Sequence, residues 1–276
     1  MKRGFIFIAA DHRLAYPSTG FDIIEDMKAL FAFLASPAFN EKHLPAGLTL
    51  DANRIAIMGA SGGGYVARVA ALYAHPKPRA VFSLFGMGGE FLTDFWVVPK
   101  ETHFPYPQSE RITAETVAPL LAHPPPVASS APIWFTDGNP REETGRMNLL
   151  IYWWRSGELL DYVLGAPVSA KLRTLPYEER LAAIPVHLRP LVVEANLDKS
   201  FPPTILVHGL ADNVVLPSES QATYDRLKEL GVRAELITVP RALHGLLLED
   251  DPNKMAPGAD EAQERAMQFM EEELRK

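Results

Sequence analysis

A serine flanked by glycines follows a short apolar segment, in the sequence Gly59-Ala60-Ser61-Gly62-Gly63. It fits the pattern G-x-S-x-G, in which a sharp strand-to-helix turn exposes the serine hydroxyl. The surroundings agree, because an apolar run at 54–58 precedes the pattern and small residues typical of a packed helix follow at 65–74. Amides at the helix N-terminus, with Gly62 first, would face an oxyanion formed there. We predict that Ser61 is a nucleophile for acyl chemistry and that Gly62 contributes to its oxyanion hole.

A serine hydroxyl needs a general base to take its proton and a carboxylate to orient that base. Of the eight histidines, His244 is best placed, since it lies in a loop directly after the last expected strand. Asp212 follows the preceding strand in the same way, whereas its rival, Asp198, comes before that strand. Parallel sheets form their sites at the carboxyl ends of strands. We therefore predict Ser61, Asp212 and His244 as nucleophile, orienting acid and general base, in the chain order of α/β-hydrolases.

The elements that must position these residues alternate along the chain. Short apolar segments predict strands at 5–10, 54–58, 80–85, 204–207 and 234–240. Helical spacing of apolar residues follows several of them, at 22–34, 65–74 and 259–275. Another helix is expected between Ser218 and Gly231, with Ser218 and Gln221 forming a capping box. This alternation predicts an α/β fold with a mostly parallel, doubly wound sheet.

Two segments have competing interpretations. Residues 1–10 superficially resemble a secretion signal, but no small-residue cleavage site follows, so we interpret 5–10 as a strand. Residues 87–200 do not continue the alternation and are rich in proline and aromatic residues, which predicts a cap inserted into a single hydrolase domain spanning 1–276. Within the cap, the apolar run 149–154 is interpreted as packed core, with the lining of an apolar substrate pocket as the alternative.

Composition excludes several classes of function. The 276 residues are 47% hydrophobic and 22% charged, which suits a globular chain, and the net charge of -7 provides no basic surface for nucleic acid. There is no cysteine, so thiolate metal sites and cysteine nucleophiles are excluded. The absence of cysteine suits a reducing cytosol but does not demand it, and we expect a cytoplasmic protein. No apolar run is long enough for a membrane span. Metal-binding motifs are absent and the histidines are scattered, so we expect neither a metal nor another cofactor.

A longer motif supports the fold assignment. The segment Ala9-Ala10-Asp11-His12-Arg13-Leu14-Ala15-Tyr16-Pro17 resembles the D-Y-R-L-A-P segment of the hormone-sensitive-lipase-like esterases, within the α/β-hydrolase superfamily, and Asp26 also matches their pattern. His12 replaces the usual tyrosine. Outside the cap, the resemblance covers the chain from Phe5 to Gly245. It implies a carboxylic-ester hydrolase without a cofactor, acting on a small-molecule ester.

The resemblance breaks at the N-terminus. In that family an H-G-G-type loop upstream of the D-Y-R-L segment donates the remaining oxyanion amides, and the sequence given starts after that point. We therefore expect an N-terminally shortened fold that lacks three strands, with an uncovered sheet edge that could pair with another copy. Loss of one oxyanion donor costs ~2.7–4 kcal/mol, or ~100- to 1,000-fold in rate. The loop Gly86-Met87-Gly88-Gly89 is a candidate source of a substitute donor.

Three hypotheses about function remain at this point. The complete triad favours an esterase that acts on a small to medium, apolar acyl substrate through an acyl-enzyme. The missing oxyanion loop favours a non-catalytic protein that binds a small ligand, or a truncated and inactive hydrolase. Amidase, peptidase and lactonase activities use the same triad and stay open.

Overall fold

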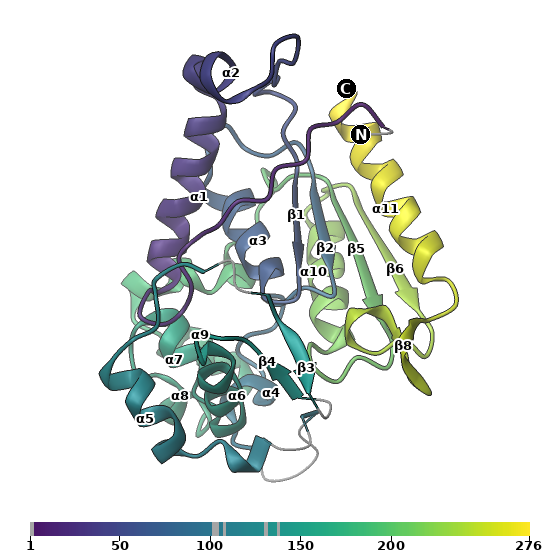
Figure 1. Ribbon diagram of the computed structural model, residues 1–276. Helices are drawn as coiled ribbons and strands as arrows, with labels where there is room; N and C mark the ends of the chain where they lie inside the picture. The colour runs from purple at the N-terminus through teal and green to yellow at the C-terminus, as the bar shows by residue number, and fades with distance from the viewer. Residues whose placement is uncertain (1–2, 101–104, 107–108, 130–131, 137–138) are drawn as a thin grey trace. The chain divides into compact units, whose positions relative to one another are not determined.

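The computed structural model describes residues 3–100, 105–106, 109–129, 132–136 and 139–276. The chain divides into two compact units (Figure 1). The first unit comprises Met1–Ala10, Ile24–Glu90 and Asn196–Lys276, and the second comprises Asp11–Ile23 and Phe91–Ala195. The assignment of 87–200 as an inserted cap stays a prediction.

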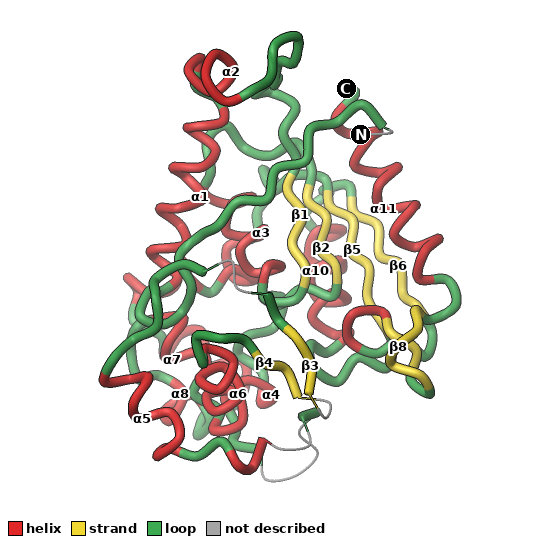
Figure 2. The backbone as a smooth tube through the Cα atoms, viewed as in Figure 1, coloured by secondary structure: helices red, strands yellow, loops and turns green. Residues whose placement is uncertain are grey.

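A parallel sheet forms the centre of the first unit (Figures 1 and 2). Its four strands lie in the order β1-β2-β5-β6, with the bounds β1 (Ile57–Ala60), β2 (Val81–Leu84), β5 (Thr204–Gly209) and β6 (Ala234–Val239). Every neighbouring pair is parallel, and the register brings Ala60 beside Leu84 and Leu84 beside Val207. The expected parallel α/β architecture is therefore confirmed.

Helices cover both faces of this sheet, as its apolar strands require. α3 (Gly63–Tyr73) and α10 (Pro217–Glu229) pack on one face, where Val81 lies in a cluster with Ala67 and Leu227. α11 (Ala259–Leu274) packs on the other face, where the next residue along β2, Phe82, lies in a cluster with Phe269. Successive strand residues point to opposite faces, so the continuous apolar runs in the sequence fill two separate cores.

The expected strand at 5–10 is wrong. These residues form no ladder, and the side chain of Phe7 is 84% exposed. The segment is instead held to α11, because Arg3 forms ion pairs with Glu264 and Glu271. A short apolar run has no periodicity that separates a buried strand from an extended loop, and only a hydrogen-bonded neighbour makes it a strand.

Two smaller expectations also need correction. The expected strand at 54–58 is displaced toward the serine, since β1 begins at Ile57. The capping box of Ser218 and Gln221 does not form, because α10 begins two residues earlier than expected, at Pro217, with Leu216 as its N-cap. Proline is favoured at a first helical position, where it has no N–H to leave unsatisfied.

The remaining elements connect these layers or belong to the second unit. The first unit also contains α2 (Pro37–His43), β7 (Leu247–Leu248) and β8 (Asp251–Met255), and α1 (Gly20–Leu34) has its first four residues in the second unit and the rest in the first. The second unit contains a two-stranded antiparallel sheet, β3 (Trp134–Thr136) and β4 (Asn139–Arg141). Its helices are short, with the bounds α4 (Asp94–Val97), α5 (Ala114–Ala122), α6 (Arg146–Ser156), α7 (Leu159–Leu164), α8 (Ser169–Leu172) and α9 (Tyr177–Ala183).

An aromatic core fills the second unit. The apolar run 149–154 lies in α6, and Leu149, Ile151, Trp153 and Trp154 are at most 3% exposed. The ring of Trp153 stacks on Tyr162. The interpretation of this run as packed core is confirmed for these four side chains.

Candidate active site

Ser61 lies at a sharp turn between β1 and α3. Its φ of +53° is a left-handed conformation that is uncommon outside glycine, and the turn is held by hydrogen bonds from Ser61 N to the Leu84 carbonyl (3.0 Å) and from Gly64 N to the Ser61 carbonyl (2.8 Å). Glycines on either side of Ser61 allow this turn, because backbone atoms of neighbouring segments lie where their side chains would be. A Cβ on Gly59 would meet the Gly63 carbonyl oxygen at 2.0 Å, and one on Gly64 would meet the Gly86 Cα at 2.4 Å. Gly59, the first glycine of the G-x-S-x-G pattern, and Gly64, directly after the pattern, therefore have a steric cause, whereas Gly63 has open space around its Cα.

The three side chains expected from the sequence come together at the carboxyl end of the sheet. Ser61 follows β1, Asp212 follows β5 and His244 follows β6. His244 Nε2 lies 2.9 Å from Ser61 Oγ, and His244 Nδ1 lies 2.8 Å from Asp212 Oδ2. Asp198 stays apart in a turn before β5, where its carboxylate accepts hydrogen bonds from Ser200. The geometry therefore favours Asp212 over its rival.

The hydrogen-bond donors and acceptors determine where the protons lie between Ser61, His244 and Asp212. An ionised Asp212 can only accept, so His244 Nδ1–H donates to it, which leaves Nε2 free to accept the Ser61 hydroxyl proton. Burial acts to raise the pKa of Asp212, but hydrogen bonds from His208 and His244 and the nearby His244 ring outweigh it and hold that pKa below its usual value. The carboxylate is thus ionised at neutral pH.

Backbone amides orient the other oxygen of the same carboxylate. Asp212 Oδ1 accepts N–H bonds from Val214 (2.9 Å) and Val215 (3.0 Å). The Asp212 side chain is fully buried, while that of His244 is 21% exposed. The acid is therefore fixed inside the protein, and the base can be reached by a substrate.

The oxyanion donor expected from the sequence is available. Gly62 is exposed at the start of α3, and its N–H forms no hydrogen bond with any described residue. The substitute donors suggested for the loop after β2 are occupied. Met87 N donates to the Ser61 carbonyl, and Gly88 N and Gly89 N both donate to the carboxylate of Glu219. The suggestion that this loop supplies a substitute oxyanion donor is therefore not supported at Met87, Gly88 or Gly89.

Sequence reasoning missed three residues around the triad. His208 contacts Asp212, the ring of Phe85 packs on His244, and Glu219 holds the loop after β2. The only available signal was position, since His208 and Phe85 lie at the carboxyl ends of β5 and β2. Glu219 gave no signal, because a glutamate in the first turn of a helix is ordinarily solvated.

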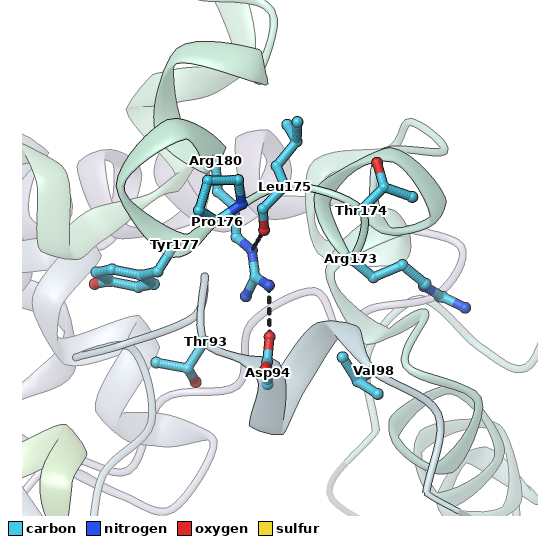
Figure 3. A pocket seen from close by; sticks show the side chains of 9 residues that line it. All are labelled: Thr93, Asp94, Val98, Arg173, Thr174, Leu175, Pro176, Tyr177 and Arg180. Atoms are coloured by element: carbon cyan, nitrogen blue, oxygen red, sulfur yellow. Dashed lines mark hydrogen bonds and ion pairs between the residues drawn. The ribbon is translucent and has the colours of Figure 1, made fainter.

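A pocket of about 520 Å³ lies entirely within the second unit (Figure 3). The Arg180 guanidinium crosses it to reach the carboxylate of Asp94 and the Leu92 carbonyl. Its lining residues come from α4 and from the segment around α9, and are Thr93, Asp94, Val98, Arg173, Thr174, Leu175, Pro176, Tyr177 and Arg180. None of them belongs to the triad.

Two further classes of site do not occur in the described part of the chain. Its His, Asp and Glu side chains form no group of three or more that could hold a metal ion. No helix there is both long and apolar enough to cross a membrane.

Comparison with known proteins agrees with this fold. Residues 1–83 match the family model described as BD-FAE, and residues 187–274 match that of the Prolyl oligopeptidase family. A truncated form of a carbohydrate esterase from gut microbiota has a TM-score of 0.50 and 17% identity, over 100% of this chain and 76% of that chain. A protein with unknown function from Staphylococcus aureus subsp. aureus Mu50 has a TM-score of 0.53 and 15% identity, over 96% of this chain and 76% of that one. The chain has the α/β-hydrolase fold.

The chain is also similar in sequence to short parts of much longer proteins. The non-reducing polyketide synthase pkbA of Emericella nidulans is 26% identical over 98% of this chain and 11% of its own length. The non-reducing polyketide synthase mapC of Penicillium roqueforti is 24% identical over 92% of this chain and 10% of its own length. The chain thus spans about a tenth of the length of these curated relatives.

Proposed function

We propose that the chain hydrolyses carboxylic esters, with Ser61 as nucleophile, His244 as general base and Asp212 as orienting acid. The main support is the unbroken pair of hydrogen bonds from Ser61 through His244 to Asp212, 2.9 and 2.8 Å long. A protein that only binds a ligand has no need for a strained serine aligned with a histidine and a buried carboxylate. We therefore favour catalysis over the non-catalytic alternative.

The acylation step follows from the direction of these hydrogen bonds. Ser61 Oγ attacks the acyl carbon while His244 Nε2 takes its proton, and the imidazolium that forms is stabilised by the ionised Asp212. The Gly62 N–H would donate to the oxyanion of the tetrahedral intermediate. His244 then returns the proton to the leaving oxygen, and the alcohol departs.

Deacylation repeats the same chemistry with water. His244 takes a proton from the water as its oxygen attacks the acyl-enzyme, and collapse of the second intermediate releases the acid and restores the Ser61 hydroxyl. One oxyanion donor typically contributes ~2.7–4 kcal/mol. A site with the Gly62 amide alone would be slower by ~100- to 1,000-fold than one with an additional donor.

Hydrolysis of p-nitrophenyl acetate, butyrate and octanoate tests this function. The folded chain should release nitrophenol, with a preference that reports the size of the acyl pocket, and Ser61→Ala should abolish the release. A fluorophosphonate probe should label the chain at Ser61 and fail to label the variant. Activity that persists in Ser61→Ala, or an unlabelled folded chain, would contradict the proposal.

The curated relatives support a second candidate substrate. Because nearly the whole chain aligns with part of proteins named polyketide synthases, we propose that its acyl group could be a polyketide chain held as a thioester. The triad attacks oxygen esters and thioesters by the same route, since both present an acyl carbon with a leaving group.

Matched substrates separate these candidates. The same acyl chain is supplied as an oxygen ester and as an N-acetylcysteamine thioester, and kcat/KM is measured for both with Ser61→Ala as the background. A higher kcat/KM for the thioester, rising with acyl length, supports release of a polyketide chain. Higher kcat/KM for short oxygen esters supports the simple esterase.

A further inference from the structure

A second histidine contacts the catalytic carboxylate from inside the first unit. His208, on β5, is fully buried. Its Nε2 lies 2.9 Å from the Val215 carbonyl oxygen and 3.3 Å from Asp212 Oδ2. Its Nδ1 lies 2.7 Å from Ser220 Oγ on α10. Both nitrogens of this ring are therefore engaged, one of them with the acid of the triad.

The partners of His208 determine its tautomer. A carbonyl oxygen can only accept a hydrogen bond, so Nε2 bears a proton that it shares between Val215 and Asp212. The Ser220 hydroxyl can donate to Nδ1, which leaves the ring neutral. A neutral ring also suits a site without solvent, because burial of a charge is costly.

The two oxygens of Asp212 are held in different ways. Two backbone amides fix Oδ1, whereas among the described residues Oδ2 contacts the two histidines, with His244 Nδ1 at 2.8 Å and His208 Nε2 at 3.3 Å. One of these, His244, must move its proton and gain charge in each turnover. His208 is thus the donor to Oδ2 that takes no part in proton transfer.

We propose that His208 is a positioning residue, which fixes the Asp212 carboxylate so that His244 stays aligned with Ser61. This proposal rests on the triad function proposed above. Without His208, Oδ2 would be held only by the group it must orient, and the two amides on Oδ1 alone would resist rotation of the carboxylate about its Cβ–Cγ bond. Catalysis would then fall through misalignment of His244, although every triad residue was still present.

The same contact affects the protonation of the acid. Burial tends to raise the pKa of Asp212, and the hydrogen bond from His208 lowers it, together with the hydrogen bond from His244 and the charge of the nearby His244 ring. Among the described residues, the titratable groups bonded to this carboxylate are His208 from β5 and His244 from the loop after β6. Removal of His208 should therefore let the Asp212–His244 pair take up a proton at higher pH.

Three variants of the full chain test this role. His208→Phe keeps a similar ring and removes the donor. His208→Gln is the conservative variant, because its amide nitrogen can reach the position of Nε2 and donate. Ser220→Ala leaves Nε2 in place and removes only the hydroxyl that orients the ring, so it serves if His208→Phe does not fold.

Two measurements report on the variants. One is the pH profile of kcat/KM for p-nitrophenyl butyrate, and the other is the low-field proton NMR signal of His244 Nδ1–H in the resting protein. In His208→Phe, kcat should fall roughly tenfold, as expected for loss of a hydrogen bond to a charged group. The acid limb should move to higher pH, and the NMR signal should move downfield as His244 becomes the sole donor to Oδ2. His208→Gln should restore both readouts in part, and Ser220→Ala should move them in the same direction by less.

The possible outcomes separate this proposal from the triad function. If folded His208→Phe, or Ser220→Ala in its place, leaves both the acid limb and the NMR signal where the wild type has them, His208 is only a packing residue. A uniform loss of activity with an unmoved acid limb also means that His208 only packs. If the wild type itself is inactive, the esterase function fails, and the NMR signal still decides whether His208 shares the carboxylate with His244.

Discussion

The ring of Phe85 packs edge-on against the imidazole of His244, with 4.8 Å between the ring centroids and 63° between the ring planes. Phe85 directly follows β2 and has a φ of +39°, so its backbone is strained as well. This contact limits the orientations open to His244. Aromatic pairs of this geometry contribute about 0.5–1.5 kcal/mol beyond their buried area.

We expect Phe85→Ala to lower kcat/KM for p-nitrophenyl butyrate by about 3- to 10-fold, because His244 would lose part of its alignment. Phe33→Ala is the matched control, since Phe33 lies on α1 of the same unit and is 45% exposed. That variant should keep the wild-type kcat/KM. Equal losses in the two variants would mean that the Phe85 ring has no particular effect on His244.

Replacement of Asp212 by asparagine should nearly abolish activity. The asparagine NH₂ would face His244 Nδ1 and favour the tautomer whose Nε2 carries the proton, so Ser61 could no longer pass its proton to Nε2. Loss of an orienting acid in a triad lowers kcat by about 10⁴-fold. Single-turnover acylation by a p-nitrophenyl ester measures this step directly. A variant that retained a tenth or more of the wild-type acylation rate would rule out this role for Asp212.

Asp212 should also make stability depend on pH. Its pKa is lower in the folded chain than its ordinary value of 3.8, so the ionised carboxylate stabilises the fold above that value. This stabilisation is lost as the pH falls below 3.8 and through the folded-state pKa. In urea unfolding, the free-energy advantage of wild type over Asp212→Asn should thus be larger at about pH 7 than at about pH 3. Exposed Asp225→Asn should change stability by less than about 0.5 kcal/mol at either pH. An advantage that stays constant with pH would contradict the assignment.

The buried carboxylate of Glu219 should be essential to the loop beside the serine. Its Oε2 accepts backbone N–H bonds from Gly88, Gly89 and Glu90, and the preceding amide, of Met87, donates to the Ser61 carbonyl. We expect Glu219→Ala to destabilise the fold by about 1–3 kcal/mol or more, because two buried amides and one partly buried amide lose their acceptor. Glu229→Ala, on the exposed end of the same helix, is the control. Urea unfolding of both variants provides the comparison, and similar small effects would show that water replaces the carboxylate without cost.

The sequence predicted those features of the fold that depend on local residue types and on the order of strands and helices. The turn around Ser61 has close backbone contacts at Gly59 and Gly64 that leave no room for a side chain, so the residue types at these positions indicate the turn. Asp212 and His244 could be found because parallel strands place their carboxyl ends at one edge. The same reasoning gave four of the expected strands, although β1 is displaced by three residues at its start.

The features that could not be predicted from the sequence depend on contacts between residues distant in sequence. Whether 5–10 forms a strand depends on a hydrogen-bonded neighbour, which no property of the segment itself reveals. Glu219 accepts bonds from a loop about 130 residues away, and its residue type suggests only a solvated helix start. His208 is an ordinary strand residue by sequence, and only the fold brings its ring to Asp212.

Neighbouring glycines at the start of α3 provide a final test of the turn. A Cβ on Gly64 would meet three backbone atoms of Gly86 and Met87 at 2.4–2.9 Å, whereas one on Gly63 would meet nothing within 4 Å. Backbone cannot move aside as a flexible side chain can, so Gly64→Ala must displace either α3 or the loop after β2. We expect it to destabilise the fold by about 1–3 kcal/mol and to lower kcat, because the Ser61 carbonyl is bonded to both segments. Gly63→Ala should leave kcat unchanged and alter stability by no more than about 1 kcal/mol, in the stabilising direction that alanine brings to a helix. Thermal unfolding and p-nitrophenyl butyrate hydrolysis of the pair measure both effects, and equal behaviour of the two variants would show that the close approach of Gly64 to Gly86 does not shape the turn.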